Sequence, residues 1–288
     1  MLGVVLTAVP TPFTPDGKVD TTVARQLLKF CAESTDGMLV AGTTGEFPAL
    51  DDSERLELID SALEIAGVDR VIAQVGAADS RRAARLATDA VRLGATTIAA
   101  ITPFYNPVSP GELHDYYSRI RDAAPLTDLY AYIFPERTGV HVPVDLFASL
   151  AQAVGLAGAK LSGSAARDVA ACAAAAPGAR VYSGDDKDLA GVLKAGGAGV
   201  ISARSAAYPE VFMGLASALA TGDTAIAASW QSFVSDIVAT GASIGRVKEA
   251  LRLRGFGPLG SRMPVGWPEG PVANQIQALV RRLTESAI

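Results

Sequence analysis

Apolar runs of strand length recur along the chain, and each is followed by a segment with the spacing of an amphipathic helix. The apolar residues in these runs are consecutive rather than alternating, which is typical of parallel strands covered on both faces. The eight runs are Val4–Val9, Met38–Ala41, Val71–Val75, Thr97–Ile101, Leu129–Ile133, Ala157–Leu161, Arg180–Tyr182 and Gly199–Ser202. This pattern predicts an α/β protein with a parallel sheet.

Start and stop signals of helices lie between the runs. The segment Ser109–Glu112 combines an N-cap serine, a proline at the first helical position and a glutamate that completes a capping box. Gly94 and Gly178 stand where helices should end before the next strand. Strand–helix units of this kind fill residues 1–222 and match a (β/α)8 TIM barrel, whose usual size is about 250 residues.

A doubly wound open sheet is the alternative architecture. Such sheets have about five to seven strands and often a glycine-rich first turn, whereas the first turn here, Pro10–Pro15, contains no glycine. We therefore favour the barrel for residues 1–222. Residues 223–288 predict a C-terminal helical extension packed on the barrel, with helices at Thr224–Ala239, Ile244–Leu253 and Val272–Glu285.

Composition narrows the class of protein. Of 288 residues, 49% are hydrophobic, which excludes an intrinsically disordered chain. The net charge of −5 argues against nucleic-acid binding, and no window of about 18 uninterrupted apolar residues predicts a membrane span. Cys31 and Cys172 are too few for a disulfide framework, and Met1–Pro10 lacks the basic start of a signal peptide. We expect a cytoplasmic protein without nucleic-acid or membrane partners.

Lys160 is the most informative residue for chemistry, because barrel enzymes place reactive groups at the C-terminal ends of their strands. It is one of six lysines and lies in the sixth apolar run. Burial lowers the pKa of a lysine, and an uncharged amine attacks a ketone to form a Schiff base. The alternative is a strand-end lysine that reaches the rim or pairs with a carboxylate, and the residue alone does not choose between these.

Other polar groups follow neighbouring strands. Thr43 and Thr44 lie in a glycine-flanked turn that offers hydroxyl and N–H groups to a small carboxylate, or that serves only as a strand-to-helix turn. Tyr105 and Tyr132 are candidate proton carriers or core residues. Arg137 is placed to bind a substrate carboxylate or to hold a loop acid.

Metal chemistry finds little support in the sequence. His114 falls on a predicted helix and His141 on a loop, far apart along the chain, so no histidine-based metal site is predicted. The pair Asp185 and Asp186 suggests either Mg²⁺ or the N-terminus of the helix after the seventh strand.

Over essentially its whole length the chain resembles the dihydrodipicolinate synthase / N-acetylneuraminate lyase family of Schiff-base aldolases. The resemblance rests on the order and spacing of several short motifs rather than on any one of them. These are Gly42-Thr43-Thr44-Gly45-Glu46, Thr102-Pro103-Phe104-Tyr105-Asn106, Tyr132 before Pro135, Arg137-Thr138-Gly139, Gly158-Ala159-Lys160, Ser183-Gly184-Asp185-Asp186 and Gly197-Ala198-Gly199-Val200-Ile201-Ser202.

The resemblance implies roles for these residues. Lys160 would form the Schiff base with pyruvate, and Tyr132 would move protons. Thr43 would link Tyr132 to Tyr105, which in this family reaches in from a neighbouring subunit, so a homo-oligomer, a tetramer, is expected. Pyruvate would be held by groups that line one pocket, namely Thr43, Thr44, Gly184 and Ile201. No metal or diffusible cofactor is required.

The resemblance leaves the second substrate open. Arg137 matches the arginine that dihydrodipicolinate synthases use on the carboxylate of aspartate semialdehyde, which favours synthesis from pyruvate and that aldehyde. Gln74-Val75-Gly76 is more similar to 2-keto-3-deoxy sugar acid aldolases. A sugar acid aldolase or an N-acetylneuraminate lyase-like enzyme that releases pyruvate is therefore the alternative. A non-catalytic barrel that binds a keto acid is a third hypothesis.

The resemblance also bears on regulation. Some synthases are inhibited by lysine, and several positions of their lysine site hold unrelated residues here. We therefore predict no lysine feedback. The substituted positions are Phe47, Pro48, Arg55, Ala78, Arg82 and Phe104.

Overall fold

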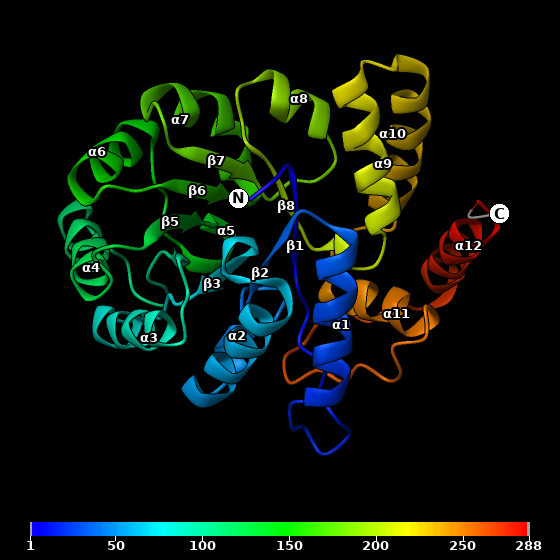
Figure 1. The fold of residues 1–288 in the computed structure, drawn as a ribbon, viewed down its shortest axis with the longest axis horizontal. Helices are drawn as coiled ribbons and strands as arrows, with labels where there is room; N and C mark the ends of the chain where they lie inside the picture. The colour runs from blue at the N-terminus through cyan, green and yellow to red at the C-terminus, as the bar shows by residue number, and fades with distance from the viewer. Residues whose placement is uncertain (1, 287–288) are drawn as a thin grey trace.

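The computed structural model describes residues 2–286 as a closed barrel surrounded by helices (Figure 1). Eight parallel strands pair in sequence order, and β8 closes the barrel by pairing with β1. The predicted (β/α)8 TIM barrel is confirmed. The strands are β1 (Val5–Ala8), β2 (Gly37–Val40), β3 (Val71–Gln74), β4 (Thr97–Ile101), β5 (Asp128–Ile133), β6 (Gly158–Leu161), β7 (Arg180–Ser183) and β8 (Gly199–Ser202).

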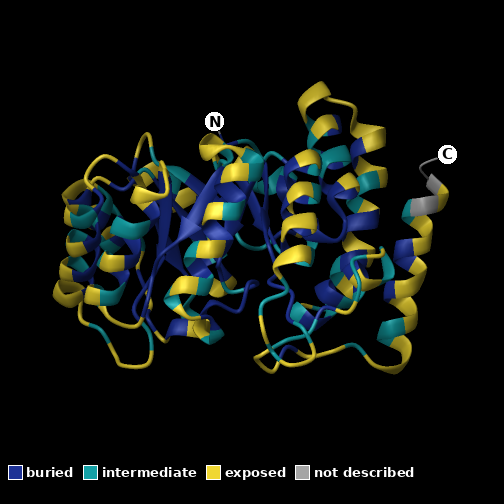
Figure 2. Ribbon diagram, turned by 60° about the horizontal axis from the view of Figure 1, so that its bottom comes forward, coloured by how far each residue is buried: buried dark blue, intermediate teal, exposed yellow. Residues whose placement is uncertain are grey.

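Helices follow the strands and form the outer layer of the barrel. Their exposed faces surround the buried strands (Figure 2). They are α1 (Thr21–Ser34), α2 (Asp52–Ala66), α3 (Ser80–Arg92), α4 (Pro110–Ala123), α5 (Pro135–Thr138), α6 (Val144–Val154), α7 (Val169–Ala175), α8 (Leu189–Lys194) and α9 (Pro209–Thr221). Short 3-10 helices lie at η1 (Phe47–Ala49), η2 (Val68–Arg70), η3 (Gly163–Asp168) and η4 (Arg204–Ala206).

The predicted start signal of α4 is confirmed. Ser109 is its N-cap, its hydroxyl oxygen accepts a hydrogen bond from the Glu112 N–H, and the Glu112 side chain returns to the Ser109 backbone. Two of the four N–H groups that a helix leaves unpaired are satisfied in this way. Local sequence alone therefore fixes where this helix begins.

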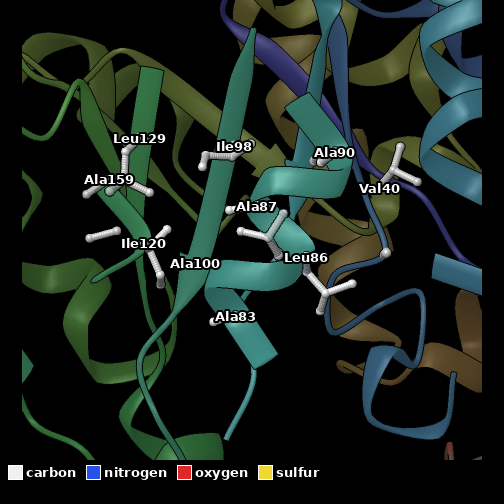
Figure 3. Close-up of a cluster of buried hydrophobic side chains, with 14 of the residues drawn as sticks. Val40, Ala83, Leu86, Ala87, Ala90, Ile98, Ala100, Ile120, Leu129 and Ala159 are labelled. Atoms are coloured by element: carbon white, nitrogen blue, oxygen red, sulfur yellow. The ribbon is translucent and has the colours of Figure 1, made fainter. Parts of the chain in front are cut away.

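Each strand has two buried faces, which explains why its apolar residues are consecutive. Along β6, Ala159 and Leu161 belong to the large core between strands and helices, whereas Gly158 and Lys160 alternate with them and point into the barrel. Figure 3 shows the outer core at α3, where Ala83, Leu86, Ala87 and Ala90 pack near Ile98 and Ala100 of β4. Small side chains bring this helix close to the sheet.

Bulky side chains fill the N-terminal end of the barrel. The rings of Tyr130 and Tyr182 lie 6.4 Å apart, among the buried residues Leu6, Leu39 and Ile72. The Tyr182 hydroxyl donates a hydrogen bond to the Gly3 carbonyl at 2.9 Å. Because this end is packed, a substrate reaches the barrel interior from the C-terminal ends of the strands.

Three further helices follow the barrel: α10 (Thr224–Ala239), α11 (Ile244–Leu253) and α12 (Gly270–Ser286). The first two have the predicted bounds. All three helices share an apolar cluster with the barrel, in which Leu251 of α11 and Ile276 of α12 join Val5 and Val200. The three helices lie together on one side of the molecule (Figure 1). The division of the chain at residue 222 stays a prediction. Across residues 2–286, no helix has both the length and the hydrophobicity that a bilayer span requires.

Candidate active site

A cavity of about 330 Å³ opens at the C-terminal ends of the strands and extends to the C-terminal helices. Strands β5 to β8 and the turn after β2 form one side of it, and residues of α10, α11 and α12 form another. Seven of the eight predicted site residues line this cavity, and Tyr105 is the exception. The seven are Thr43, Thr44, Tyr132, Arg137, Lys160, Gly184 and Ile201.

Lys160 and Tyr132 are neighbours across the sheet. They are register partners between β6 and β5, and both side chains are at inward-facing positions. The Lys160 Nζ lies 4.6 Å from the centre of the Tyr132 ring. Lys160 is 5% exposed and forms no ion pair within the described part of the chain. It therefore neither reaches the solvent nor pairs with a carboxylate, the two alternatives that the sequence left open.

The turn after β2 brings Thr43 to Tyr132. Their hydroxyl oxygens are 3.1 Å apart, a hydrogen-bond distance. Two non-glycine residues with positive φ, Ala41 at 54° and Glu46 at 57°, shape this turn, and the Glu46 N–H closes it on the Thr43 carbonyl at 3.0 Å. Strained backbone of this kind persists where the surrounding structure holds it, commonly at functional sites.

Tyr105 lies outside the cavity and is 94% exposed. It follows β4 with φ of 87°, the largest positive value of any non-glycine residue that the structure describes. The relay within one chain therefore consists of Thr43 and Tyr132. The contribution of Tyr105 from a neighbouring subunit, which the resemblance implied, stays a prediction.

Arg137 lines the cavity from the short helix α5. Its guanidinium carbon lies 5.8 Å from the centre of the Phe134 ring, and it forms no ion pair with the described residues. The neighbouring Glu136 accepts a hydrogen bond from the Ser164 N–H at 2.7 Å instead. Arg137 is thus not held by a loop acid, and its charge is available to a ligand.

The acids after β7 do not form the predicted helix N-terminus. Helix α8 is capped by Asp188, whose carboxylate accepts from the Gly191 N–H at 2.8 Å. Asp186 instead accepts from the Ser202 hydroxyl at 2.5 Å and from the Arg204 guanidinium at 2.5 Å. The expectation was wrong because the chain continues for two more residues before α8 begins, which leaves Asp186 to pair across to the segment after β8.

Sequence reasoning missed a buried ion pair behind the cavity. The Lys248 Nζ of α11 donates to Glu46 Oε1 at 2.5 Å and to the Gly260 carbonyl at 2.6 Å, and both side chains of the pair are fully buried. Burial lowers the pKa of Lys248, and Glu46 opposes that shift. The second oxygen of Glu46 accepts from the N–H groups of Arg262 and Met263. The sequence feature that could have revealed this pair was Lys248 itself, a lysine between buried positions of an amphipathic helix.

No group of three or more His, Cys, Asp and Glu side chains that could hold a metal ion occurs between residues 2 and 286. His114 lies on α4, and its Nε2 is 3.2 Å from the hydroxyl oxygen of Ser149 on α6. The polar side chains that line the cavity supply the Lys160 amine, hydroxyls, guanidinium groups and the carboxylates of Asp185 and Asp186.

Several known proteins are similar to this chain in both sequence and fold. The sequence model of the Dihydrodipicolinate synthetase family matches residues 1–286. The chain belongs to this family. A 4-hydroxy-tetrahydrodipicolinate synthase from Symbiobacterium thermophilum is 33% identical over 270 residues, which are 91% of this chain and 92% of that protein. The predicted resemblance is confirmed.

Solved structures of similar proteins have the same fold as this chain. The 4-hydroxy-tetrahydrodipicolinate synthase from Methylacidiphilum fumariolicum SolV superposes with a TM-score of 0.89 at 26% identity, over 99% of this chain and 97% of that chain. YagE, a prophage protein of the same family from E. coli K12, was solved in complex with pyruvate and superposes with a TM-score of 0.86 at 27% identity, over 99% of each chain. The predicted enzyme class, a lyase or synthase of this family, is confirmed.

Proposed function

We propose that Lys160 forms a Schiff base with pyruvate and that the resulting enamine makes or breaks a carbon–carbon bond. The observation that carries this proposal is the placement of Lys160. Its amine is buried without a carboxylate partner, 4.6 Å from the ring of Tyr132, at the accessible end of the barrel. An amine adds to a ketone in its uncharged form, and no carboxylate of the described residues pairs with this one.

The reaction follows from these groups. The Lys160 amine adds to the ketone of pyruvate, and water leaves to give an imine. The protonated imine withdraws electrons from the adjacent methyl carbon, which loses a proton and becomes an enamine. The enamine carbon attacks an aldehyde carbon, and the new alkoxide takes up a proton. Tyr132 can both donate and accept protons, and Thr43 holds its hydroxyl in place.

Thr44 and Arg137 are the proposed groups for carboxylates. Thr44 is buried beside Thr43, at the closed end of the cavity, and suits the carboxylate of pyruvate. Arg137 lines the cavity without an ion-pair partner and suits the carboxylate of an aldehyde. The relatives named 4-hydroxy-tetrahydrodipicolinate synthase support aspartate semialdehyde as that aldehyde. Gly184 and Ile201 complete the wall.

The proposal extends to assembly and location. The Tyr105 side chain is exposed on the surface, and its backbone has a strained positive φ. Contact with a second copy of the chain would bury the side chain. We therefore propose a homotetramer in which Tyr105 enters a neighbouring site. Cys31 and Cys172 are both free and buried, which supports a reducing compartment, the cytoplasm.

The proposal is tested by trapping the Schiff base. Borohydride reduction in the presence of pyruvate is expected to add a stable mass to the peptide that contains Lys160, and Lys160→Ala is expected to give no adduct. An adduct on another lysine, or none, contradicts the proposed chemistry and favours a keto-acid-binding barrel.

Coupled assays then separate the substrates. We expect condensation of pyruvate with aspartate semialdehyde to exceed cleavage of 2-keto-3-deoxygluconate or N-acetylneuraminate in kcat/KM. Faster release of pyruvate from either sugar acid would reassign the second substrate and leave the Schiff base intact. Sedimentation at assay concentration tests the tetramer, and a fully active monomer contradicts it.

A further inference from the structure

The outer part of the cavity contains an arginine whose positive charge is not neutralised. Arg246 of α11 lines the cavity together with Ile237 of α10 and Ile276 of α12. It forms no ion pair with any described residue. Within residues 2–286, its guanidinium makes one hydrogen bond, from Nη1 to the Thr240 carbonyl, and its Nε is buried without an acceptor.

Arg204, which lines the same cavity, has a structural role and serves as a comparison. Its guanidinium is paired with the buried carboxylate of Asp186 at 2.5 Å, and that carboxylate is further fixed by the Ser202 hydroxyl. Arg204 therefore brings its own counter-charge. Arg246 has no such counter-charge among the described residues, although it is partly buried and its Nε has no acceptor.

Helix stability does not explain Arg246. It lies in the first turn of α11, where its backbone N–H donates to the Ser243 N-cap hydroxyl at 3.0 Å. The helix dipole disfavours a cation in the first turn. The loop before the helix leaves room for the side chain, because Gly241, with φ of 84°, has no Cβ where the guanidinium lies. A side chain at that position would collide with Arg246.

The helix that carries Arg246 is fixed to the reacting end of the site. Two residues further along α11, Lys248 forms the buried pair with Glu46, which belongs to the same turn as Thr43 and Thr44. The backbone N–H groups of Arg262 and Met263 hold the other oxygen of Glu46. The helix that carries the guanidinium is thus anchored to the turn that contains the groups proposed to hold pyruvate.

We propose that Arg246 binds an anionic group of the second reactant, at the wall that the C-terminal helices contribute. This assignment rests on the proposed function, because it takes the inner part of the cavity as the pyruvate site. The anion is a carboxylate or a phosphate, both of which the guanidinium fork can bind through two N–H groups. The apolar side chains of Ile237, Val247 and Ile276 line the same cavity. Arg246 is then a specificity residue in addition to Arg137.

The test measures binding to enzyme that cannot turn over. The borohydride-reduced pyruvate adduct is titrated calorimetrically with three aldehydes: succinate semialdehyde, glyceraldehyde 3-phosphate and uncharged glyceraldehyde. We expect at least one of the anionic aldehydes to bind about tenfold or more tightly than glyceraldehyde, since a charge-assisted hydrogen bond contributes about that much. Arg246→Gln is expected to reduce the difference severalfold, with the remainder coming from Arg137, while Arg246→Lys keeps more of it.

Arg252→Gln is the matched control, because Arg252 lies on the same helix, pairs with Glu249 and does not line the cavity. It is expected to leave all three affinities unchanged. Equal affinity for charged and uncharged aldehydes in the wild type, or the same preference in Arg246→Gln, overturns the assignment. If only one of the two anionic aldehydes binds more tightly than glyceraldehyde, the result shows whether Arg246 binds a carboxylate or a phosphate. Failure to form the pyruvate adduct overturns the proposed function instead, and the titration is then run on the unmodified protein with the same expected differences.

Discussion

Two buried lysines lie on opposite sides of the turn that follows β2, and they differ in what surrounds them. Lys248 is fully buried and has a complete set of partners: the Glu46 carboxylate, a backbone carbonyl and the Ser261 hydroxyl. Lys160 is nearly as buried, yet no charged side chain of the described residues pairs with it. Its amine lies over the face of the Tyr132 ring instead. The first lysine is held in an ion pair, whereas the second has no carboxylate partner among the described residues.

The difference shows that burial alone does not identify a reactive lysine. Both side chains are buried, but in one of the two places an ion pair offsets the cost of burying a charge. Reactivity also requires open space for a substrate. Lys160 lines the cavity, while Lys248 does not.

Lys160→Met is expected to reduce kcat at least about a thousandfold, because the covalent nucleophile is lost. The free energy of unfolding should change little, since no ion pair is broken. Activity is measured with pyruvate and aspartate semialdehyde, and stability by urea titration. A stability loss as large as that of the Lys248 variant would remove the distinction between the two lysines.

Lys248→Met is expected to lower the free energy of unfolding by about 3–5 kcal/mol, because it leaves the Glu46 carboxylate buried and unpaired. Urea titration measures the loss. The matched double variant Glu46→Gln/Lys248→Met should recover part of it, because the isolated charge is gone. Folded Lys248→Met protein should still be trapped by borohydride at Lys160, and loss of trapping would show that Lys248 takes part in the chemistry.

Tyr132→Phe is expected to lower kcat by about 10²–10⁴, the range for loss of a positioned acid–base group. The ring that faces Lys160 remains, so the fold and the cavity should be retained. Thr43→Val, which keeps the shape of the side chain and removes the hydroxyl bonded to Tyr132, should have a smaller effect of the same kind. Equal rates for Tyr132→Phe and the wild type would assign proton transfer elsewhere.

Free lysine is expected to leave the activity unchanged. Arg55 is a third buried cation, held by the Gln74 and Gly76 carbonyls, and burial lowers its pKa to about 10. The nearby Arg82 guanidinium contributes to the same lowering of the pKa. Two cations repel the ammonium group of lysine. A titration with lysine up to millimolar concentration checks this, and strong inhibition would show that another anionic group offsets them.

Much of the barrel was predictable because local rules govern its parts. Strand β4 and strand β8 have the predicted bounds, and Ser109 and Glu112 cap α4 as predicted. The seven residues that meet in the cavity were also found from the sequence, because the ends of parallel strands meet at one end of a barrel. The Asp186–Arg204 pair was not found, because its partners follow different strands and no spacing rule connects them.

The order of strands and helices, the closed sheet and the side chains at the strand ends could all be read from the chain, since they follow from periodicity, capping and the geometry of parallel strands. Contacts between distant segments settle which lysine has a carboxylate partner and which arginine has none. Glu46 and Lys248 lie 202 positions apart in the chain, and the state of a buried charge depends on neighbours in space rather than in sequence.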